Sequence, residues 1–378
     1  MKILGIDTSC DETSIAILEI KKEKIKVLAN VISSQVKIHQ KYGGVFPSLA
    51  KREHQKNLII IFKEALKNAN LLKRKTFKLN FKNIENILKR DEELLINFKE
   101  FFKKYGFSRI DLISITQGPG LEPCLFVGIN FAKALSLVSK TKILPINHIK
   151  AHLFSSFLSF DKIPKILFPA LGLIVSGGHT QLLLLKSFKN IKTIGQTKDD
   201  AAGECLDKTA RILGLPYPGG PQIEKLALNC KSNFFNIKLP RPMIYQKNYD
   251  FSFSGLKTAV YYDFSKRPKE IRNSLKYKQE MAKEIQEAVF DSLLIKTKRA
   301  ILDLNIKTLL TGGGVFSNKL LREKITLLSK ELNVDLFLPE REYCTDNGAM
   351  VALTGYLEIN FMNFKKYGKI TAKPNLNI

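Results

Sequence analysis

The chain has 378 residues, of which 44% are hydrophobic, and its formal net charge is +26. That length and apolar content allow one large domain or two to three ordinary ones, and they exclude a long disordered chain. The longest apolar stretches, such as Ile166 to Val175, are too short to span a bilayer, and the five cysteines lack disulfide-like spacing, so we expect a reduced, cytoplasmic protein with no membrane segment.

The two halves of the chain predict the same order of elements, a strand–turn–strand–strand unit followed by helix–strand pairs. In the first half the predicted elements are strands at 2–7, 14–20 and 25–33, a helix at 49–68, a strand at 109–116, a helix at 125–139 and a strand at 142–146. In the second half they are strands at 171–176, 181–186 and 192–196, a helix at 201–213, a strand at 307–311, a helix at 318–332, a strand at 334–338 and a helix at 347–357.

This repeat predicts an α/β, two-lobed, actin-like fold, which is a duplicated ribonuclease H-like fold. We expect a nucleotide and a metal in the cleft between the lobes, because ligands of open sheets bind at the carboxyl ends of strands. The predicted lobes are residues 1–147, joined by a C-terminal helix at 347–378, and residues 148–346. A basic segment at about 67–104, with 11 basic and 5 acidic residues, reads as one or two inserted helices. It is either a solvated decoration or a surface for RNA or a partner protein.

The net charge favours a polyanionic partner such as nucleic acid. Lysines outnumber arginines 50 to 11, and Ile, Asn and Phe are abundant. Codon drift in an AT-rich genome produces the same bias, so charge alone leaves both interpretations open.

Two turns at equivalent places in the halves carry small and acidic residues. The first, Gly5 to Thr13, includes Asp11 and Glu12, which could orient a nucleophile or hold a metal-bound water. Its counterpart, Ser176-Gly177-Gly178-His179-Thr180, resembles a phosphate cradle, because small residues let backbone N–H groups approach an anion. An ordinary polar hairpin is the alternative for the first turn.

His148 and His152 are four residues apart, so on a helix they share one face and can bind one metal ion. Asp346 is the predicted third ligand, because it lies at the start of a helix after a strand end. Paired surface histidines are the alternative. A zinc protease would need a Glu directly after the first His, and Ile149 stands there instead.

Further polar and glycine-rich positions in the second half are candidates for nucleotide contacts. Gly312-Gly313-Gly314 ends a strand and opens a helix, where a helix N-terminus favours negative charge. Asn318 could contact an adenine or ribose, or simply cap the helix. Asp207 precedes a rigid turn at Tyr217 to Pro221, for which an ordinary loop is the alternative.

Taken in order, these motifs resemble the bacterial tRNA N6-adenosine threonylcarbamoyltransferase (TsaD) family of the actin-like superfamily. The resemblance runs nearly from end to end. The matching segments are 5–13, 118–121, 147–148 with His152, 175–180, 199–204 with 207–208, 217–221, 251–258, 312–315 with Asn318, and 345–348.

The resemblance implies transfer of the threonylcarbamoyl group from threonylcarbamoyl-AMP to N6 of adenosine 37 in tRNAs that read codons beginning with A, with release of AMP. It implies one divalent metal ion, iron or zinc, bound by residues matching His148, His152 and Asp346, and Asp11 and Glu12 near the reacting centre. The adenylate, with ATP as a further candidate ligand, would be contacted by residues matching Ile174, Val175, Ser176, Gly177, Gly178, Asp207, Gly220 and Asn318.

The implied partners are tRNA, a paralogous non-catalytic subunit, a small ATPase subunit, and an upstream synthase that supplies threonylcarbamoyl-AMP. Two positions depart from the family pattern: Lys150 between the two His, and the length of the 67–104 segment. The alternatives are an actin-like ATPase or kinase, which gives the His pair no role, and a non-catalytic scaffold subunit, which would be expected to lack it.

Overall fold

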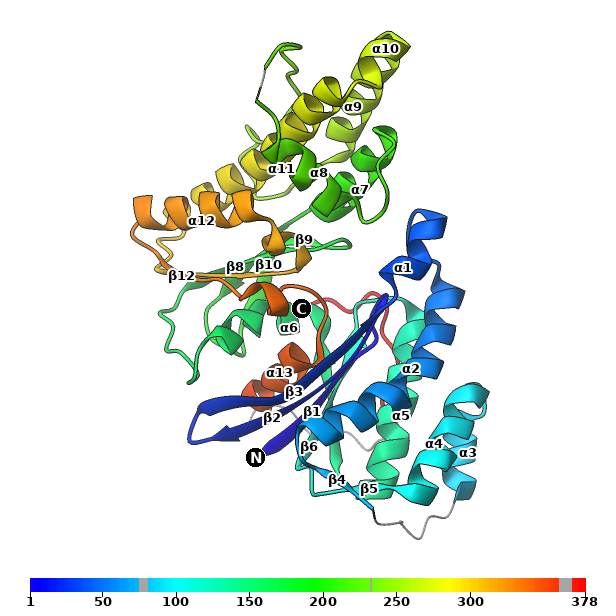
Figure 1. The fold of residues 1–378 in the computed structure, drawn as a ribbon. Helices are drawn as coiled ribbons and strands as arrows, with labels where there is room; N and C mark the ends of the chain where they lie inside the picture. Colours follow the sequence, from blue (N-terminus) through cyan, green and yellow to red (C-terminus); the bar gives the residue numbers. More distant parts are fainter. Residues whose placement is uncertain (75–80, 232, 360–368) are drawn as a thin grey trace. The chain divides into compact units, whose positions relative to one another are not determined.

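Two five-stranded sheets with one and the same topology organise the chain, as a computed structural model shows (Figure 1). The structure describes residues 1–74, 81–231, 233–359 and 369–378. The chain divides into two compact units: the first comprises 1–37, 45–164 and 346–378, and the second comprises 38–44 and 165–345.

The first sheet has the strand order β3-β2-β1-β6-β7 and the second the order β10-β9-β8-β11-β12. In each, the first three strands pair antiparallel and the last two join in parallel. The strands are β1 Lys2–Asp7, β2 Glu12–Lys21, β3 Lys24–Ser34, β6 Leu112–Gly118, β7 Lys142–Asn147, β8 Ala170–Val175, β9 Thr180–Leu185, β10 Ile191–Gln196, β11 Thr308–Gly312 and β12 Asp335–Phe337. The shared order confirms the predicted duplication.

Alternation along β1 sends successive side chains to opposite faces of the first sheet. Leu4 and Ile6 join the buried cluster formed with α2 and α5, whereas Gly5 faces α13. The helices of this unit are α2 Pro47–Asn68, α3 Phe81–Leu88, α4 Glu92–Lys104, α5 Glu122–Ser139, α6 His148–Phe154 and α13 Gly348–Glu358, with short elements α1 Val36–His39, η2 Ser155–Ser159, β4 Leu72–Lys73 and β5 Gly106–Phe107. Of these, α1 straddles the boundary between the units.

The segment predicted as inserted helices forms α3 and α4, and its residues 75–80 lie outside the described part. The helices are not a solvated decoration. Leu94, Phe98 and Phe102 are at most 1% exposed and belong to the hydrophobic core of the first unit. The apolar residues scattered through this basic segment therefore anchor it to the first unit, while Lys82, Lys103 and Lys104 are exposed.

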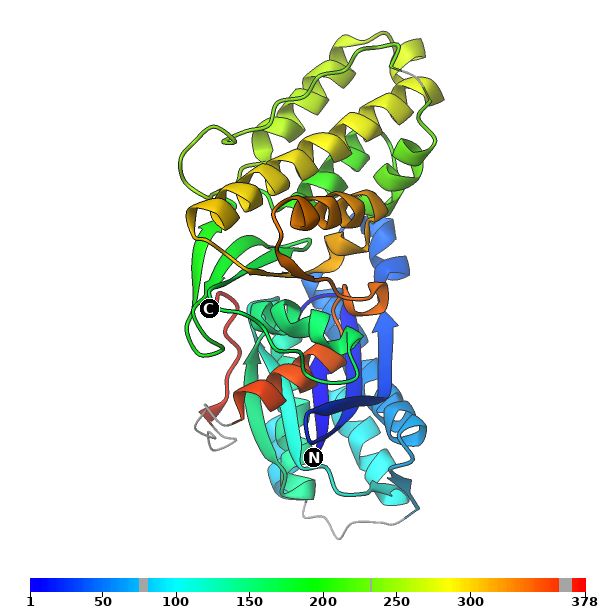
Figure 2. The same ribbon diagram turned by 90° about the vertical axis from the view of Figure 1, so that its left-hand side faces the viewer.

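Helices gather on one face of the second sheet and build a separate core there (Figure 2). They are α7 Ala202–Ile212, α8 Gly219–Leu228, α9 Ser254–Lys266, α10 Lys269–Arg272, α11 Leu275–Asp303 and α12 Lys319–Glu331, with short turns η1 Gln40–Tyr42, η3 Gly314–Ser317 and η4 Arg341–Tyr343. The sequence patterns did not predict α8, α9 or α11.

The observed units differ from the predicted lobes in three places. Residues 148–164 belong to the first unit, because α6 continues directly from β7 and packs against α13. Residues 38–44 group with the second unit. The C-terminal helix ends at Glu358; part of its predicted range, 360–368, lies outside the described residues, and 369–378 is irregular. Pro374 disfavours helix there. Within the described ranges, we find no helix with the length and apolar content that crossing a membrane requires.

Candidate metal centre and nucleotide-binding turns

Two histidines and one aspartate converge in the first unit. The ring centroids of His148 and His152 are 4.6 Å apart on α6. The Asp346 Oδ1 atom lies 3.0 Å from His152 Nε2 and 3.6 Å from His148 Nε2. One candidate ligand atom from each of the three residues lies within 4.8 Å of the others. The structure thus brings together all three predicted ligands.

These separations fit one metal ion. Bonds of about 2.0 Å at tetrahedral angles put neighbouring ligand atoms about 3.3 Å apart. The two distances from the Asp346 carboxylate bracket that value. Imidazole nitrogen and carboxylate oxygen form a donor set that suits zinc and iron. Three protein ligands leave a position for a substrate atom, as in catalytic metal sites.

The electrostatics of the group reflect its buried, opposite charges. Burial alone lowers the pKa of His148, but the charges of Asp346 and Asp7 outweigh it and raise that pKa to about 9. Burial opposes ionisation of Asp346, yet His148 and His152 hold its pKa well below the usual range. Because metal ligation needs neutral imidazole, metal binding must displace a proton from His148.

Close packing of α13 on the first sheet positions Asp346 next to the two histidines. A Cβ on Gly5 would lie 1.9 Å from the Gly348 carbonyl oxygen, so the helix start rests directly on β1. The Asn347 side chain caps α13 by accepting from Met350 N at 2.9 Å, and Ser14 Oγ accepts from Gly348 N at 2.8 Å. Asp346, one residue before this cap, is therefore fixed beside the end of β1.

Asp7, which the sequence patterns did not single out, contacts the Nδ1 atom of His148. It ends β1, is fully buried, and its Oδ2 atom lies 3.3 Å from His148 Nδ1. Its other oxygen accepts from Ser9 N at 2.9 Å. A carboxylate at Nδ1 keeps the proton there and leaves Nε2 as the ligand atom. Only its place at a strand end, next to the acidic turn, could have indicated this role.

Replacing Asp7 by asparagine is expected to weaken metal binding by about 10–100-fold. The Asn amide would keep its acceptor for Ser9 and turn its donor toward His148 Nδ1, which favours a proton on Nε2, the ligand atom. Zinc affinity measured by competition with a chromophoric chelator checks this. Asp11→Asn is the matched control, because Asp11 belongs to the same acidic turn but not to the group of metal ligands. Equal affinities for both variants would contradict the role of Asp7.

The acidic turn lies beside the same group. Asp11 is 7% exposed, and burial together with Asp11 and Asp346 raises the pKa of Glu12 well above its usual range. His54, on α2, stabilises this turn: its ring contacts Cys10 O at 3.0 Å and Thr13 Oγ1 at 2.8 Å. No spacing in the sequence signals that contact, since His54 lies on α2.

Lys150, the departure between the two histidines, points away from the metal group. Its Nζ atom forms an ion pair with Glu358 Oε1 at 2.7 Å, near the end of α13. The extra positive charge is therefore paired outside the metal site.

The second unit carries the glycine-rich turns. Ile174 and Val175 are buried at the end of β8, and Ser176 Oγ accepts from His179 N at 3.1 Å. A Cβ on Gly177 or Gly178 would meet nothing within 4 Å, so this turn is open to a ligand. His179 belongs to this unit and is not part of the metal group found among the described residues.

Two residues that were predicted to contact the nucleotide also satisfy N–H groups at the starts of helices. Asp207 Oδ1 accepts from the backbone N–H groups of Gly219 and Gly220 at 2.6 and 3.3 Å, at the start of α8. The Asn318 amide caps α12 through Leu321 N at 3.1 Å and donates to Gln286 Oε1 at 2.8 Å. The capping alternative for Asn318 is thus observed, and Gly220 lies in the first turn of α8 rather than in a loop.

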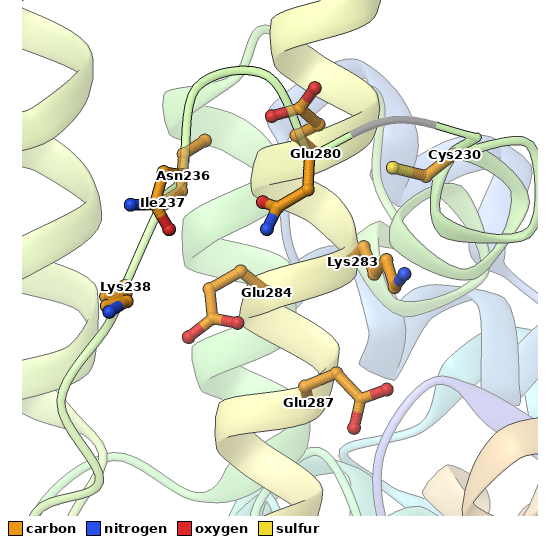
Figure 3. Close-up of a pocket in the computed structure, with 9 residues that line it drawn as sticks. Cys230, Asn236, Ile237, Lys238, Glu280, Lys283, Glu284 and Glu287 are labelled. Carbon is orange, nitrogen blue, oxygen red and sulfur yellow. The ribbon is translucent and has the colours of Figure 1, made fainter.

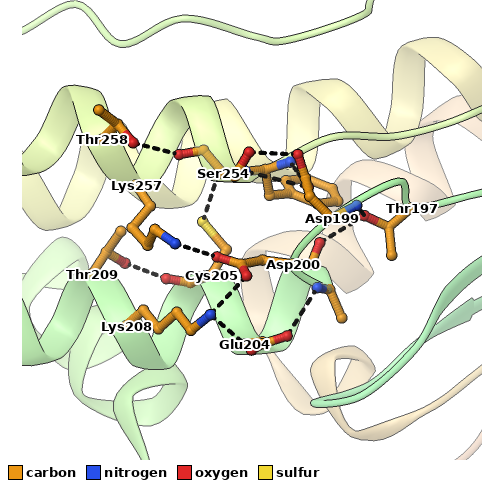
Figure 4. Close-up of polar contacts among 12 residues, drawn as sticks. Thr197, Asp199, Asp200, Glu204, Cys205, Lys208, Thr209, Ser254, Lys257 and Thr258 are labelled. Atoms are coloured by element: carbon orange, nitrogen blue, oxygen red, sulfur yellow. Dashed lines mark hydrogen bonds and ion pairs between the residues drawn. The ribbon is translucent and has the colours of Figure 1, made fainter.

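Two motifs of the second unit are joined by a polar network (Figure 4). Asp199 accepts from the Ser254 hydroxyl at 2.5 Å and from Phe253 N at 2.8 Å, at the start of α9. Asp200 pairs with Lys208 at 2.6 Å and Lys257 at 2.9 Å. Burial opposes their ionisation, but these donors lower the pKa of both carboxyl groups. The network fixes the loop that leads into α7.

A cavity of about 290 Å³ lies elsewhere in the second unit, along α11 (Figure 3). Its three glutamates have structural partners. Glu280 accepts from Phe234 N and Phe235 N, Glu284 pairs with Arg241, and Glu287 pairs with Lys324. Contacts of Glu280 and Glu284 therefore hold the loop that contains Phe234 and Arg241 against α11, and none of the predicted site residues lines the cavity.

Two five-stranded sheets with the same strand order define a two-lobed α/β protein. Two solved structures of HypF share the fold: one aligns with a TM-score of 0.54 at 13% identity over 96% of this chain, and that from T. kodakarensis with 0.55 at 12% over 94%. The chain spans about half the length of those proteins, 47% and 48%.

The family model described as TsaD, tRNA N6-adenosine threonylcarbamoyltransferase, matches residues 26–77 and 90–353. Proteins of that name are similar throughout: 43% identity in Thermosipho africanus over the whole of both chains, 41% in Persephonella marina over 94% of this chain and 90% of the relative, and 38% in Bacillus cereus over 93% and 90%. The chain belongs to this family of transferases. Residues 78–89, which include α3, fall between the matched segments.

Proposed function

We propose that this protein transfers the threonylcarbamoyl group from threonylcarbamoyl-AMP to N6 of adenosine 37 in tRNAs that read codons beginning with A, and releases AMP. The observation that carries the proposal is the group of His148, His152 and Asp346, beside an acidic turn, in a member of the threonylcarbamoyltransferase family. The net charge of +26 supports a polyanionic substrate.

The reaction needs placement more than a strong nucleophile. The adenosine N6 amine attacks the carbamoyl carbon, the bond from that carbon to the phosphate oxygen breaks, and AMP leaves with the electron pair. The amine must lose one proton, and Asp11 and Glu12 are the proposed acceptors. The raised pKa of Glu12 brings its proton affinity closer to what a base needs near neutral pH.

The residues of each unit have separate tasks in this proposal. His148, His152 and Asp346 hold one iron or zinc ion, which when bound supplies positive charge that stabilises developing negative charge on oxygen. The open turn at Gly177 and Gly178 binds the adenylate phosphate through backbone N–H groups, and Asp207, Gly220 and Asn318 flank the nucleoside.

Cellular context follows from the same resemblance. A synthase that makes threonylcarbamoyl-AMP must supply the donor, and a paralogous subunit and a small ATPase subunit are the proposed partners. A tRNA substrate supports a cytoplasmic location for the reaction. ATP is a further candidate for the adenylate position.

A transfer assay tests the proposal. Purified protein, preformed threonylcarbamoyl-AMP, unmodified tRNA and candidate partner subunits are combined, and the modified nucleoside is detected by mass spectrometry. We expect product with the wild type and a large loss with Asp11→Asn or Glu12→Gln, while zinc affinity stays close to that of the wild type. ATP hydrolysis that needs no tRNA, without any modified nucleoside, would support the ATPase alternative instead.

A further inference from the structure

Residues 370–377, which we name the strap, lie along the end of β6 and the turn after it in the first unit (Figure 2, red). Gln117 accepts from Lys373 N at 2.9 Å through its carbonyl, and its side chain donates to Thr371 O at 2.8 Å. Ile370 is completely buried in the core of this unit. The strap is therefore anchored both by packing and by backbone hydrogen bonds.

Glycine lets the strap approach this closely. A Cβ on Gly118, whose φ is +149°, would lie 1.9 Å from the Lys373 carbonyl oxygen. Two residues further, Gly120 N donates to Pro374 O at 3.1 Å. The strap thus lies directly on the turn between β6 and α5, with no side chain between the two backbones.

One amide joins the strap to the helix that carries the histidines. The Asn147 Oδ1 atom caps α6 by accepting from Ile149 N at 2.9 Å and Lys150 N at 3.2 Å. The Nδ2 atom of the same side chain donates to Asn377 O at 3.2 Å. Because His148 directly follows Asn147, the orientation of this amide and of the first turn of α6 are coupled to the strap.

We propose that the strap is a positioning element for the metal centre, so that the affinity of His148, His152 and Asp346 for a divalent metal depends on residues 370–377. This inference rests on the proposed metal site. Groups that orient metal ligands from behind typically change metal affinity by about 10–100-fold when removed. The strap acts through the Asn147 amide and touches none of the three ligands in the interactions described.

The test compares metal affinity in three forms of the chain: the wild type, a form that stops after Lys369, and Asn147→Ser. Serine keeps a capping oxygen for α6 but has no N–H donor for Asn377. Zinc affinity is measured by chelator competition, and the ligand field is followed through the visible absorption of bound cobalt. We expect about a tenfold loss of affinity on truncation, a smaller loss of about threefold for Asn147→Ser, and an altered cobalt spectrum in both.

A core variant separates positioning from general destabilisation. Leu88→Ala removes a completely buried side chain of α3, outside the strap and the metal group, and should lower stability while leaving zinc affinity unchanged. Wild-type affinity in both the folded truncated chain and Asn147→Ser would overturn the positioning role. If truncation prevents folding, Asn147→Ser alone decides. Failure of the wild type to bind zinc or cobalt would instead overturn the metal site itself.

Discussion

Replacing His152 by alanine is expected to abolish transfer and to weaken zinc binding by more than about a hundredfold. The residue is completely buried and its Nε2 atom lies 3.0 Å from Asp346, so the change removes one of three ligands. Loss of a direct ligand should exceed the 10–100-fold effects of outer groups. Chelator competition gives the affinity, and mass spectrometry of the modified nucleoside gives the transfer rate.

Lys150→Ala is the matched control on the same helix. Its charge pairs with Glu358 and not with the histidines, so zinc affinity should stay within about threefold of the wild type. Circular dichroism must show that His152→Ala is folded. A folded His152→Ala protein that binds zinc and transfers at the wild-type rate would contradict the assignment of His152 as a ligand.

Gly5→Ala is expected to destabilise the first unit by about 3 kcal/mol, near the upper end for overpacking. The new Cβ would meet the Gly348 carbonyl oxygen at 1.9 Å and Ala352 N at 2.7 Å, and both are backbone atoms that cannot swing aside. Relief requires the start of α13 to move off β1. Denaturant unfolding, monitored by circular dichroism, gives the free energy of unfolding.

The comparison variant is Gly177→Ala. Nothing lies within 4 Å of a Cβ at that position, so its free energy of unfolding should change by less than about 0.5 kcal/mol. Similar stabilities for the two variants would mean that α13 is free to shift on the first sheet. Zinc affinity measured on Gly5→Ala adds a second readout, because Asp346 moves with the helix.

Period-two and helical patterns were sufficient to predict both sheets and the two histidines on one helix face. They were not sufficient for α11, because its buried set includes Glu280, Gln286 and Lys296, which interrupt an apolar stripe. In α8 the initial Gly219-Gly220-Pro221 resembles a loop, yet Asp207 satisfies the first N–H groups and the helix begins there.

The candidate site was predictable where chemistry shows in the residue types, and not where it depends on distant contacts. His148, His152 and Asp346 could be named from spacing and position. The support from Asp7 and His54 could not, because each contacts its target across a strand end or from another helix. For Lys150 the position in the sequence was misleading. It lies between the two histidines and suggested an altered metal site, but its side chain pairs with Glu358.

The metal ligands come from chain segments that are far apart, since His152 and Asp346 are separated by 194 positions in the sequence. A bound ion would therefore act as a crosslink that closes a very long loop of the polypeptide. Binding only to the folded form raises stability by mass action, about 2.7 kcal/mol at a metal concentration one hundred times the dissociation constant. Heat resistance of this protein should thus follow the metal supply, and chelation should lower the melting temperature of the first unit.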